Sequence, residues 1–226
     1  MLQITFTIAT LLCLILFYYG TKKNKIVSLI YFTWLVIIGS ITLSGFFVSN
    51  PKSFIVAIVS TIALSVFVFQ KVDVGNINQK ILLTIHLLRI PVEVILFGLF
   101  IQKKIPVLMT FQGWNFDIVI GITAIFFLLT AFRRESKIRD KVFLVWNVIG
   151  LIFLTIIVVI AILSSPLPIQ QFGFEQPNIA ILEFPFCFLP TIVVPIVALS
   201  HLLLIKCIIN NGRPSMQKQK FQGKPE

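Results

Sequence analysis

Seven long apolar runs constrain this chain more than any other feature of its sequence. A helix needs about 20 apolar residues to cross the hydrocarbon core of a bilayer. Lipid offers the backbone no hydrogen-bond partners, so a spanning segment must satisfy its own peptide groups. The sequence therefore predicts an all-α, polytopic transmembrane bundle of seven helices. The expected spans are roughly residues 2–20, 26–49, 53–70, 81–101, 114–132, 142–164 and 186–209.

The composition excludes a soluble domain. Hydrophobic residues make up 58% of the chain and charged residues 12%, and the mean hydropathy is +1.01. A soluble protein of this size would expose too much apolar surface. The net charge of +11 is not read as a nucleic-acid interface, because the basic residues lie between apolar runs. Three scattered cysteines, Cys13, Cys187 and Cys207, form neither a disulfide framework nor a metal-binding pattern.

The basic residues predict the orientation of the spans. Fifteen of the nineteen Lys and Arg residues lie in the connections after the first, third and fifth runs and at the C-terminal end. Because cytoplasmic loops are enriched in Lys and Arg, we expect an outside N-terminus and a cytoplasmic C-terminus in the inner membrane. The first run starts with "MLQITF", has no basic residue before it and no cleavage site after it. We therefore expect a retained helix rather than a signal peptide.

One domain and a tail account for the chain. Residues 1–209 are predicted to form the transmembrane domain, and residues 210–226 a basic, disordered cytoplasmic tail. Two longer connections, "QKKIPVLMTFQGWNFD" and "SSPLPIQQFGFEQPNIAILEFP", fall on the outer side. Their aromatic, proline and polar residues are typical of segments at the headgroup level. We expect them to cap the outer end of the bundle.

The fourth run contains three polar residues that an apolar span would not need. His86, Arg89 and Glu93 are spaced i, i+3 and i+7, so they share one face of a helix, and Pro91 lies between them. A charge near the bilayer centre costs about 3 kcal/mol on insertion scales. We expect Arg89 and Glu93 to neutralise each other along the helix. The face should therefore contact other helices or trapped water rather than lipid.

Polar residues of three other runs reach matching depths. At about 1.5 Å per residue, His86 and His201 both lie about 8 Å from the cytoplasmic ends of their helices. Asn147 begins the sixth run at a similar level, and Asn115 and Asp117 enter the fifth run from outside. The sequence predicts one polar column that binds a substrate or relays protons. Its candidate residues are His86, Arg89, Glu93, Asn115, Asp117, Asn147 and His201.

Structural interpretations of these residues stay open. Asn115 and Asp117 are also typical N-caps of a helix. An Arg89–Glu93 pair also serves to fix helix register, and a membrane histidine such as His201 also serves as an interhelical hydrogen-bond partner. No catalytic residue is assigned, and no metal site is expected. With only two histidines, a three-histidine zinc site cannot form.

Several stretches resemble an uncharacterised family of bacterial seven-span inner-membrane proteins. The resemblance covers roughly residues 81–205 and has no known activity attached to it, so it implies the topology and no substrate. It lies in "MTFQGWNFDIVIGITA", "VWNVIGL", "QQFGFEQPNIA", "FPFCFLPTIVVPIVALSH" and the HxxRxPxE pattern of residues 86–93.

Four functions remain compatible with this pattern. The preferred hypothesis is a small-molecule or proton-coupled transporter, because the polar column crosses most of the bilayer. An intramembrane enzyme would use His86 or His201 as a base and Arg89 to hold a lipid or isoprenoid phosphate. Haem between His86 and His201 is a third alternative, and a non-catalytic sensor or assembly factor a fourth. The expected partners are the bilayer and a small, anionic or lipid ligand, with no nucleic acid. Substrate, coupling ion and oligomeric state are not predicted.

Overall fold

All regular structure in the described residues is helical. The structure is a computed structural model that describes residues 1–130 and 137–211. Six of the helical segments described are long and apolar enough to cross a membrane, and a seventh apolar helix, Asp117–Thr130, is shorter. The elements in chain order are α1 (Leu2–Gly20), α2 (Lys25–Leu43), α3 (Phe46–Ser49), η1 (Pro51–Ser53), α4 (Phe54–Lys71), η2 (Val74–Asn76), α5 (Gln79–Ile85), η3 (His86–Leu88), α6 (Arg89–Ile101), η4 (Val107–Met109), α7 (Asp117–Thr130), α8 (Lys137–Leu163), η5 (Ala180–Leu182), η6 (Leu189–Val193) and α9 (Val194–Asn211).

Local sequence sets several of these boundaries. The side chain of Asn24 accepts a hydrogen bond from the N–H of Val27 and caps α2, and Asn78 caps α5 in the same way. The predicted run 26–49 is not one helix. Gly45 separates α2 from α3 with a φ of +74°, a conformation that glycine adopts at little cost.

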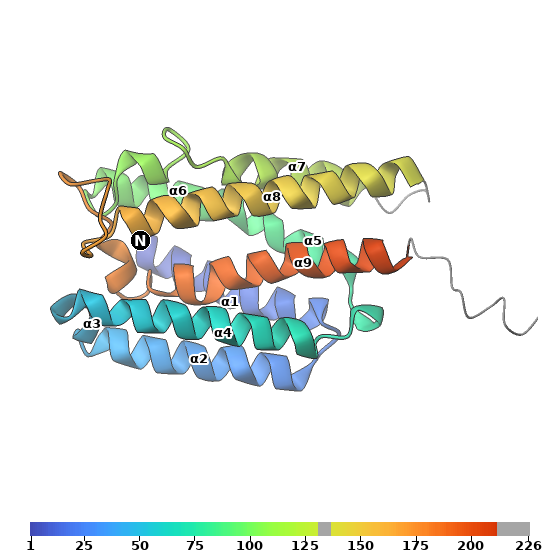
Figure 1. Cartoon of the computed structure of the whole chain (residues 1–226), viewed down its shortest axis with the longest axis horizontal. Coiled ribbons are helices and arrows are strands. Elements are labelled where there is room, and N and C mark those ends of the chain that lie inside the picture. The colour runs from blue at the N-terminus through green and yellow to red at the C-terminus, as the bar shows by residue number, and fades with distance from the viewer. Residues whose placement is uncertain (131–136, 212–226) are drawn as a thin grey trace, which may run out of the picture.

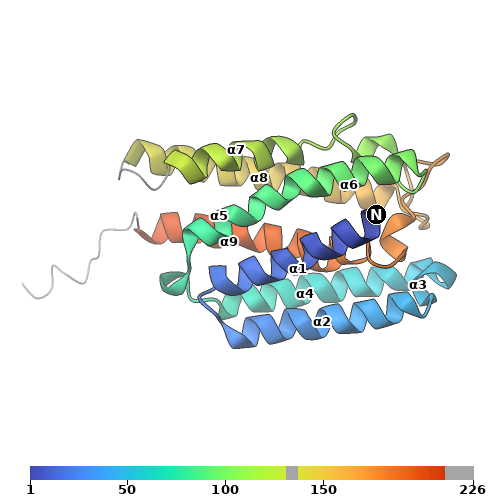
Figure 2. The same ribbon diagram turned by 180° about the vertical axis from the view of Figure 1, so that it is seen from behind.

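Two spans form the centre of the bundle. The long spans differ in how much of their most apolar stretch is buried inside the bundle. The buried share is 56% in Gln79–Ile101 and 61% in Leu189–Asn210, but only 22–39% in the other four long spans. α9 packs against α1, α4, α5 and α8. Figure 1 shows α9 between the α7–α8 layer and the α2–α4 layer. α5 and α6 cross the opposite side obliquely, from the level of α9 to that of α7 and α8 (Figure 2).

The fourth predicted span is interrupted rather than continuous. α5 ends at Ile85, a single 3₁₀ turn covers His86–Leu88, and α6 continues from Arg89. Pro91 lacks the N–H that would bond to the carbonyl of Leu87, and its ring crowds that carbonyl. A tighter turn accommodates both effects. In a 3₁₀ turn residues three apart are eclipsed, so His86 and Arg89 lie directly one above the other.

The two long connections fold together at one end of the bundle. Lys104 forms an ion pair with Glu183, and the backbone N–H of Ile179 bonds to the carbonyl of Lys104 at 3.0 Å. The amide of Gln176 donates to the carbonyl of Ile105 at 2.5 Å. These contacts bind the α6–α7 connection to the α8–α9 connection, as expected for a cap.

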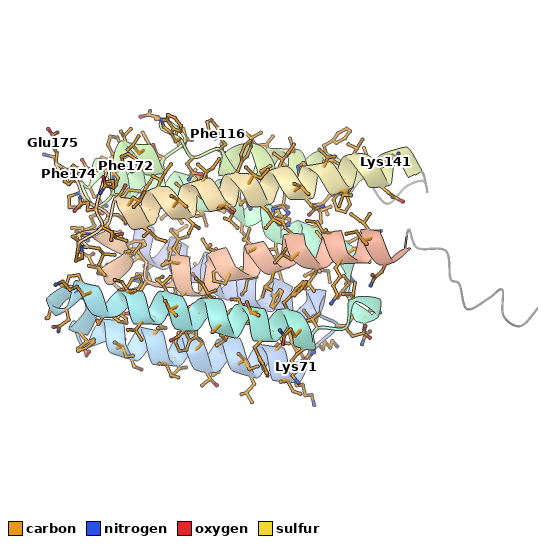
Figure 3. The ribbon with its side chains drawn as sticks, viewed as in Figure 1. Lys71, Phe116, Lys141, Phe172, Phe174 and Glu175 are labelled. Atoms are coloured by element: carbon orange, nitrogen blue, oxygen red, sulfur yellow. The ribbon has the colours of Figure 1, made fainter. Side chains whose placement is uncertain are left out.

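The two ends of the bundle can be identified by the residues that lie at them. Phe172, Phe174 and Glu175 lie at the capped end, which also holds the N-terminus, whereas Lys71 and Lys141 lie towards the opposite end (Figure 3). α9 ends at that opposite end, where it packs against η2. Residues 212–226 of the predicted tail, and Arg133 and Arg134 of the most basic connection, lie outside the described residues.

Candidate functional site

The seven predicted site residues lie in one buried cluster between η3, α6, α7, α8 and α9. They come from four separate parts of the chain, and none is more than 7% exposed. Their exposed fractions are 0% for His86, Asn147 and His201, 1% for Glu93, 2% for Asn115, 4% for Arg89 and 7% for Asp117.

Arg89 is the centre of this cluster. Its Nη1 donates to Oδ1 of Asp117 at 2.9 Å in a buried ion pair. Its Nη2 lies 3.1 Å from Nε2 of His201 and 3.5 Å from the carbonyl oxygen of Gly150. One guanidinium on α6 therefore contacts α7, α8 and α9, which a planar group with five N–H donors is suited to do.

Arg89 and Glu93 interact through their charges, as the sequence suggests, but they form no direct ion pair. Among the described residues the ion pair of Arg89 is with Asp117, and Glu93 is bonded to Asn115 instead. α7 begins at Asp117 beside Arg89, so a carboxylate on a neighbouring helix is presented to the guanidinium. A spacing of four residues places two side chains on one face but does not make them bond.

Asn115 links the carboxyl group of Glu93 to the backbone at the start of α7. Its Nδ2 donates to Oε1 of Glu93 at 2.5 Å and to the carbonyl of Met109 at 3.1 Å. Its Oδ1 accepts the backbone N–H of Asp117 at 3.1 Å. Of the two capping candidates, Asn115 therefore caps the start of α7. The carboxylate of Asp117 binds Arg89.

The two histidines are in direct contact. Their ring centroids are 3.9 Å apart and the rings are nearly parallel, at 27°, and Trp146 meets each ring edge-on or obliquely at 5.4 and 5.5 Å. Nδ1 of His201 lies 2.8 Å from Oδ1 of Asn147, whose Nδ2 donates to the carbonyl of Phe143 at 2.8 Å. Haem ligated by two histidines would lie between them. Two stacked imidazoles in contact leave no room for that macrocycle, so this geometry does not fit haem.

Four buried polar atoms of the cluster have no hydrogen-bond partner among the described residues. They are Nδ1 and Nε2 of His86, Nε of Arg89 and Oε2 of Glu93. An unpaired buried donor or acceptor costs about 1–3 kcal/mol. The cluster is therefore only partly satisfied by the described residues.

Two glycines that the sequence analysis did not single out shape the site. A Cβ on Gly150 would lie 2.4 Å from Cε1 and Nε2 of His201, and one on Gly121 would lie 2.8 Å from Cγ1 of Ile90. Gly150 follows Asn147 by three residues, and Gly121 follows Asp117 by four. Both spacings put the glycine on the same helix face as a predicted site residue, which is the signal that would have found them.

Comparison with known proteins identifies a family for most of the chain. Residues 46–209 match the family described as "Domain of unknown function (DUF8737)". The matched region runs from α3 to the end of the last span and includes all seven site residues, which agrees with the resemblance to an uncharacterised family. No curated protein and no solved structure matches the chain.

Proposed function

The chain belongs to the family described as "Domain of unknown function (DUF8737)", and we propose that it is a proton-coupled transporter of a small solute. The buried cluster around Arg89 would be its binding and relay site. Ionisable residues inside a membrane are expensive and usually mark substrate or ion pathways. The observation that carries the proposal is a set of buried contacts around Arg89. Asn115 bonds to Glu93 and accepts the backbone N–H of Asp117, and Arg89 contacts the carboxylate of Asp117 and the ring of His201.

The unpaired atoms favour transport over a purely structural role. A polar network that only holds helices together gains most when every member is satisfied. Here His86, Arg89 and Glu93 each keep at least one buried polar atom that has no partner in the part of the chain that the structure describes. Solute groups or water would supply the missing partners, and their exchange would cost less than opening a fully satisfied network.

The depth of the cluster favours a transporter over a lipid-modifying enzyme. Glu93 lies eight residues from Ile101, or about 12 Å from the capped end of its span. His86 lies seven residues from Gln79, or about 10 Å from the other end. His86, Arg89 and Glu93 thus occupy the middle of the span. An enzyme acting on a lipid headgroup would need its reactive groups near one interface.

The direction of the bundle is part of the proposal. Basic residues at the end opposite the cap support an assignment of that end to the cytoplasm, because cytoplasmic loops are enriched in Lys and Arg. The cap would then face the outside, with the inner membrane as the location. The seventh spanning segment would be α7 together with the residues that flank it.

Proton movement in reconstituted vesicles tests the proposal. The purified protein is placed in liposomes that contain a pH-sensitive dye, and a potassium diffusion potential drives protons inward. We expect faster acidification than in empty liposomes, and loss of that difference in Arg89→Gln and Glu93→Gln. Glu175→Gln is the matched control, since it makes the same change at an exposed residue of the cap (Figure 3).

The two variants also separate the alternatives. Normal acidification in both Arg89→Gln and Glu93→Gln, with wild-type stability, would contradict the proposed site. If wild-type vesicles acidify only when a solute is added, the flux is coupled to that solute. A screen of small carboxylates and phosphates follows from the positive charge of Arg89.

A further inference from the structure

We propose that Asn147 is a positioning residue that keeps the proton of His201 on Nδ1. Nε2 is then left as a lone pair for which Arg89 and an incoming proton compete. Four contacts fix this arrangement: Asn147 with Phe143, Asn147 with His201, Arg89 with His201, and Arg89 with Asp117. Its consequence for transport rests on the proposed function, whereas the assignment of the tautomer does not.

The orientation of the Asn147 amide comes first. Nδ2 of Asn147 lies 2.8 Å from the carbonyl oxygen of Phe143, one turn earlier on α8. Of the two ends of the Asn147 amide, only the NH₂ group can donate to a carbonyl oxygen, so this contact places the amide nitrogen there. The amide oxygen consequently faces His201, with Oδ1 2.8 Å from Nδ1. An amide oxygen only accepts, so Nδ1 must carry a hydrogen.

Arg89 gives the same answer from the other side of the ring. Its Nη2 lies 3.1 Å from Nε2 of His201, and a guanidinium has donors and no acceptor. Nε2 must therefore offer a lone pair. The neutral Nδ1–H tautomer is the one form of His201 that makes both hydrogen bonds. In the other neutral tautomer, Nδ1 would carry no hydrogen and would face the Asn147 oxygen, which also only accepts. The N–H at Nε2 would then face an N–H of Arg89.

A proton that arrives at His201 can bind only at Nε2. It would then place an imidazolium N–H against Nη2 of Arg89, so that two donors and two positive charges would face each other beside the carboxyl groups of Asp117 and Glu93. The neighbouring His86 is stacked on the ring and adds no negative charge. From α8 the facing groups are the neutral Asn147 and Trp146. Protonation and the Arg89–His201 contact therefore exclude each other.

The displaced arm of Arg89 supplies the coupling. Nη1 stays with Asp117, while Nη2 and the already unpaired Nε become two adjacent donors. Two adjacent guanidinium N–H groups match a carboxylate or phosphate. Binding of a proton at His201 thus prepares a site for an anionic group at Arg89. This order predicts that proton and anion move in the same direction.

Nitrogen-15 NMR of histidine-labelled protein tests the tautomer directly. The chain has only two histidines, and a His86→Gln variant identifies the His201 signals. We expect the wild-type protein at neutral pH to show a protonated Nδ1 and an unprotonated Nε2 at His201. Asn147→Leu should remove this preference. Asn147→Asp, which keeps an acceptor oxygen, should retain it. Val148→Leu, on the exposed side of the same helix, is the control.

The outcomes are distinguishable from failure of the proposed function. A wild-type His201 with its proton on Nε2, or an unchanged tautomer in Asn147→Leu, overturns the inference. The wild-type spectrum shows which nitrogen of His201 carries the proton even if the Asn147→Leu variant does not fold. Loss of acidification in Asn147→Leu vesicles, with recovery in Asn147→Asp, supports the role in transport. If wild-type vesicles carry no protons, the coupling fails and the tautomer is judged by the spectrum alone.

Discussion

Arg89 determines how the buried charges are arranged at the scale of single residues. Its two terminal nitrogens point to different helices, with Asp117 on one side and His201 with Gly150 on the other. A lysine carries the same charge on a single nitrogen and lacks the planar fork. The position therefore needs an arginine for its geometry as well as for its charge.

The Arg89–Asp117 pair should be costly to break from one side. Removal of one member leaves the other charge buried without a partner, for which about 3–5 kcal/mol is typical. We expect Asp117→Ala and Arg89→Met each to lower the free energy of unfolding by about that amount. The double variant Arg89→Met/Asp117→Leu should lose less free energy of unfolding than the two single variants lose together. Unfolding in detergent with increasing denaturant measures all three.

A half-exposed ion pair provides the control for this cycle. The Lys104–Glu183 pair of the cap is about 30% exposed on each side chain, so Glu183→Ala should cost only about 0–1 kcal/mol. Additive losses in the double variant of Arg89 and Asp117 would show that the two residues do not interact.

At the scale of elements, α8 provides the surface against which α9 places His201. Asn147 and Gly150 are three residues apart on α8, so they lie on one face of that helix. Asn147 bonds to the ring, and Gly150 leaves room for it. The interrupted α5–η3–α6 span has the complementary role, because its 3₁₀ turn brings His86 directly below Arg89. The glycine on α8 and the interrupted span together allow His86, Arg89 and His201 to meet.

Gly150→Ala tests how closely α8 and α9 fit. The added Cβ would lie 2.4 Å from Cε1 and Nε2 of His201, so the ring must shift away from Arg89. We expect a loss of stability of about 1–3 kcal/mol, as for overpacked cores, together with slower vesicle acidification. Gly75→Ala is the matched control, since its Cβ would meet Asp73 only at an ordinary distance of 3.4 Å. Equal behaviour of the two variants would contradict the predicted clash.

At the scale of the whole molecule, the bundle has two unlike ends. One end is closed by the paired connections around Lys104 and Glu183, and the other carries exposed basic residues such as Lys71 and Lys141. The buried cluster lies between these ends, and its residues His86, Arg89, Glu93 and His201 belong to the two spans that are most enclosed by protein. Solute would thus have to pass the cap on one side and the basic turns on the other.

Cysteine labelling tests the proposed orientation of these ends. Glu175→Cys should react with a membrane-impermeant maleimide in intact cells, whereas Lys141→Cys should react only after the cells are permeabilised. Both positions are exposed (Figure 3). The unchanged protein is the control, because Cys13, Cys187 and Cys207 are buried. The reverse pattern would place the cap in the cytoplasm.

The sequence alone determined the helical class and singled out the polar residues that are costly to expose to lipid. Apolar runs of membrane length allow few structures other than helices. The all-helical class is confirmed for residues 1–130 and 137–211, in which six helices are long enough to span. The spacing of His86, Arg89 and Glu93 placed them on one face because helical periodicity is a local property. The rise of about 1.5 Å per residue placed His201 and Asn147 at a depth close to that of His86, because this rise is also a local property of a helix.

The partners of these residues were decided by the tertiary structure. Arg89 binds Asp117 and His201, which are 28 and 112 residues away, and not Glu93, which is one turn away on its own helix. Helical periodicity gives the direction of a side chain but not the helix that faces it. The start of α7 at Asp117 and the close approach of α9 at Gly150 supply that information. Both depend on how separate helices pack, which no local pattern in the chain encodes.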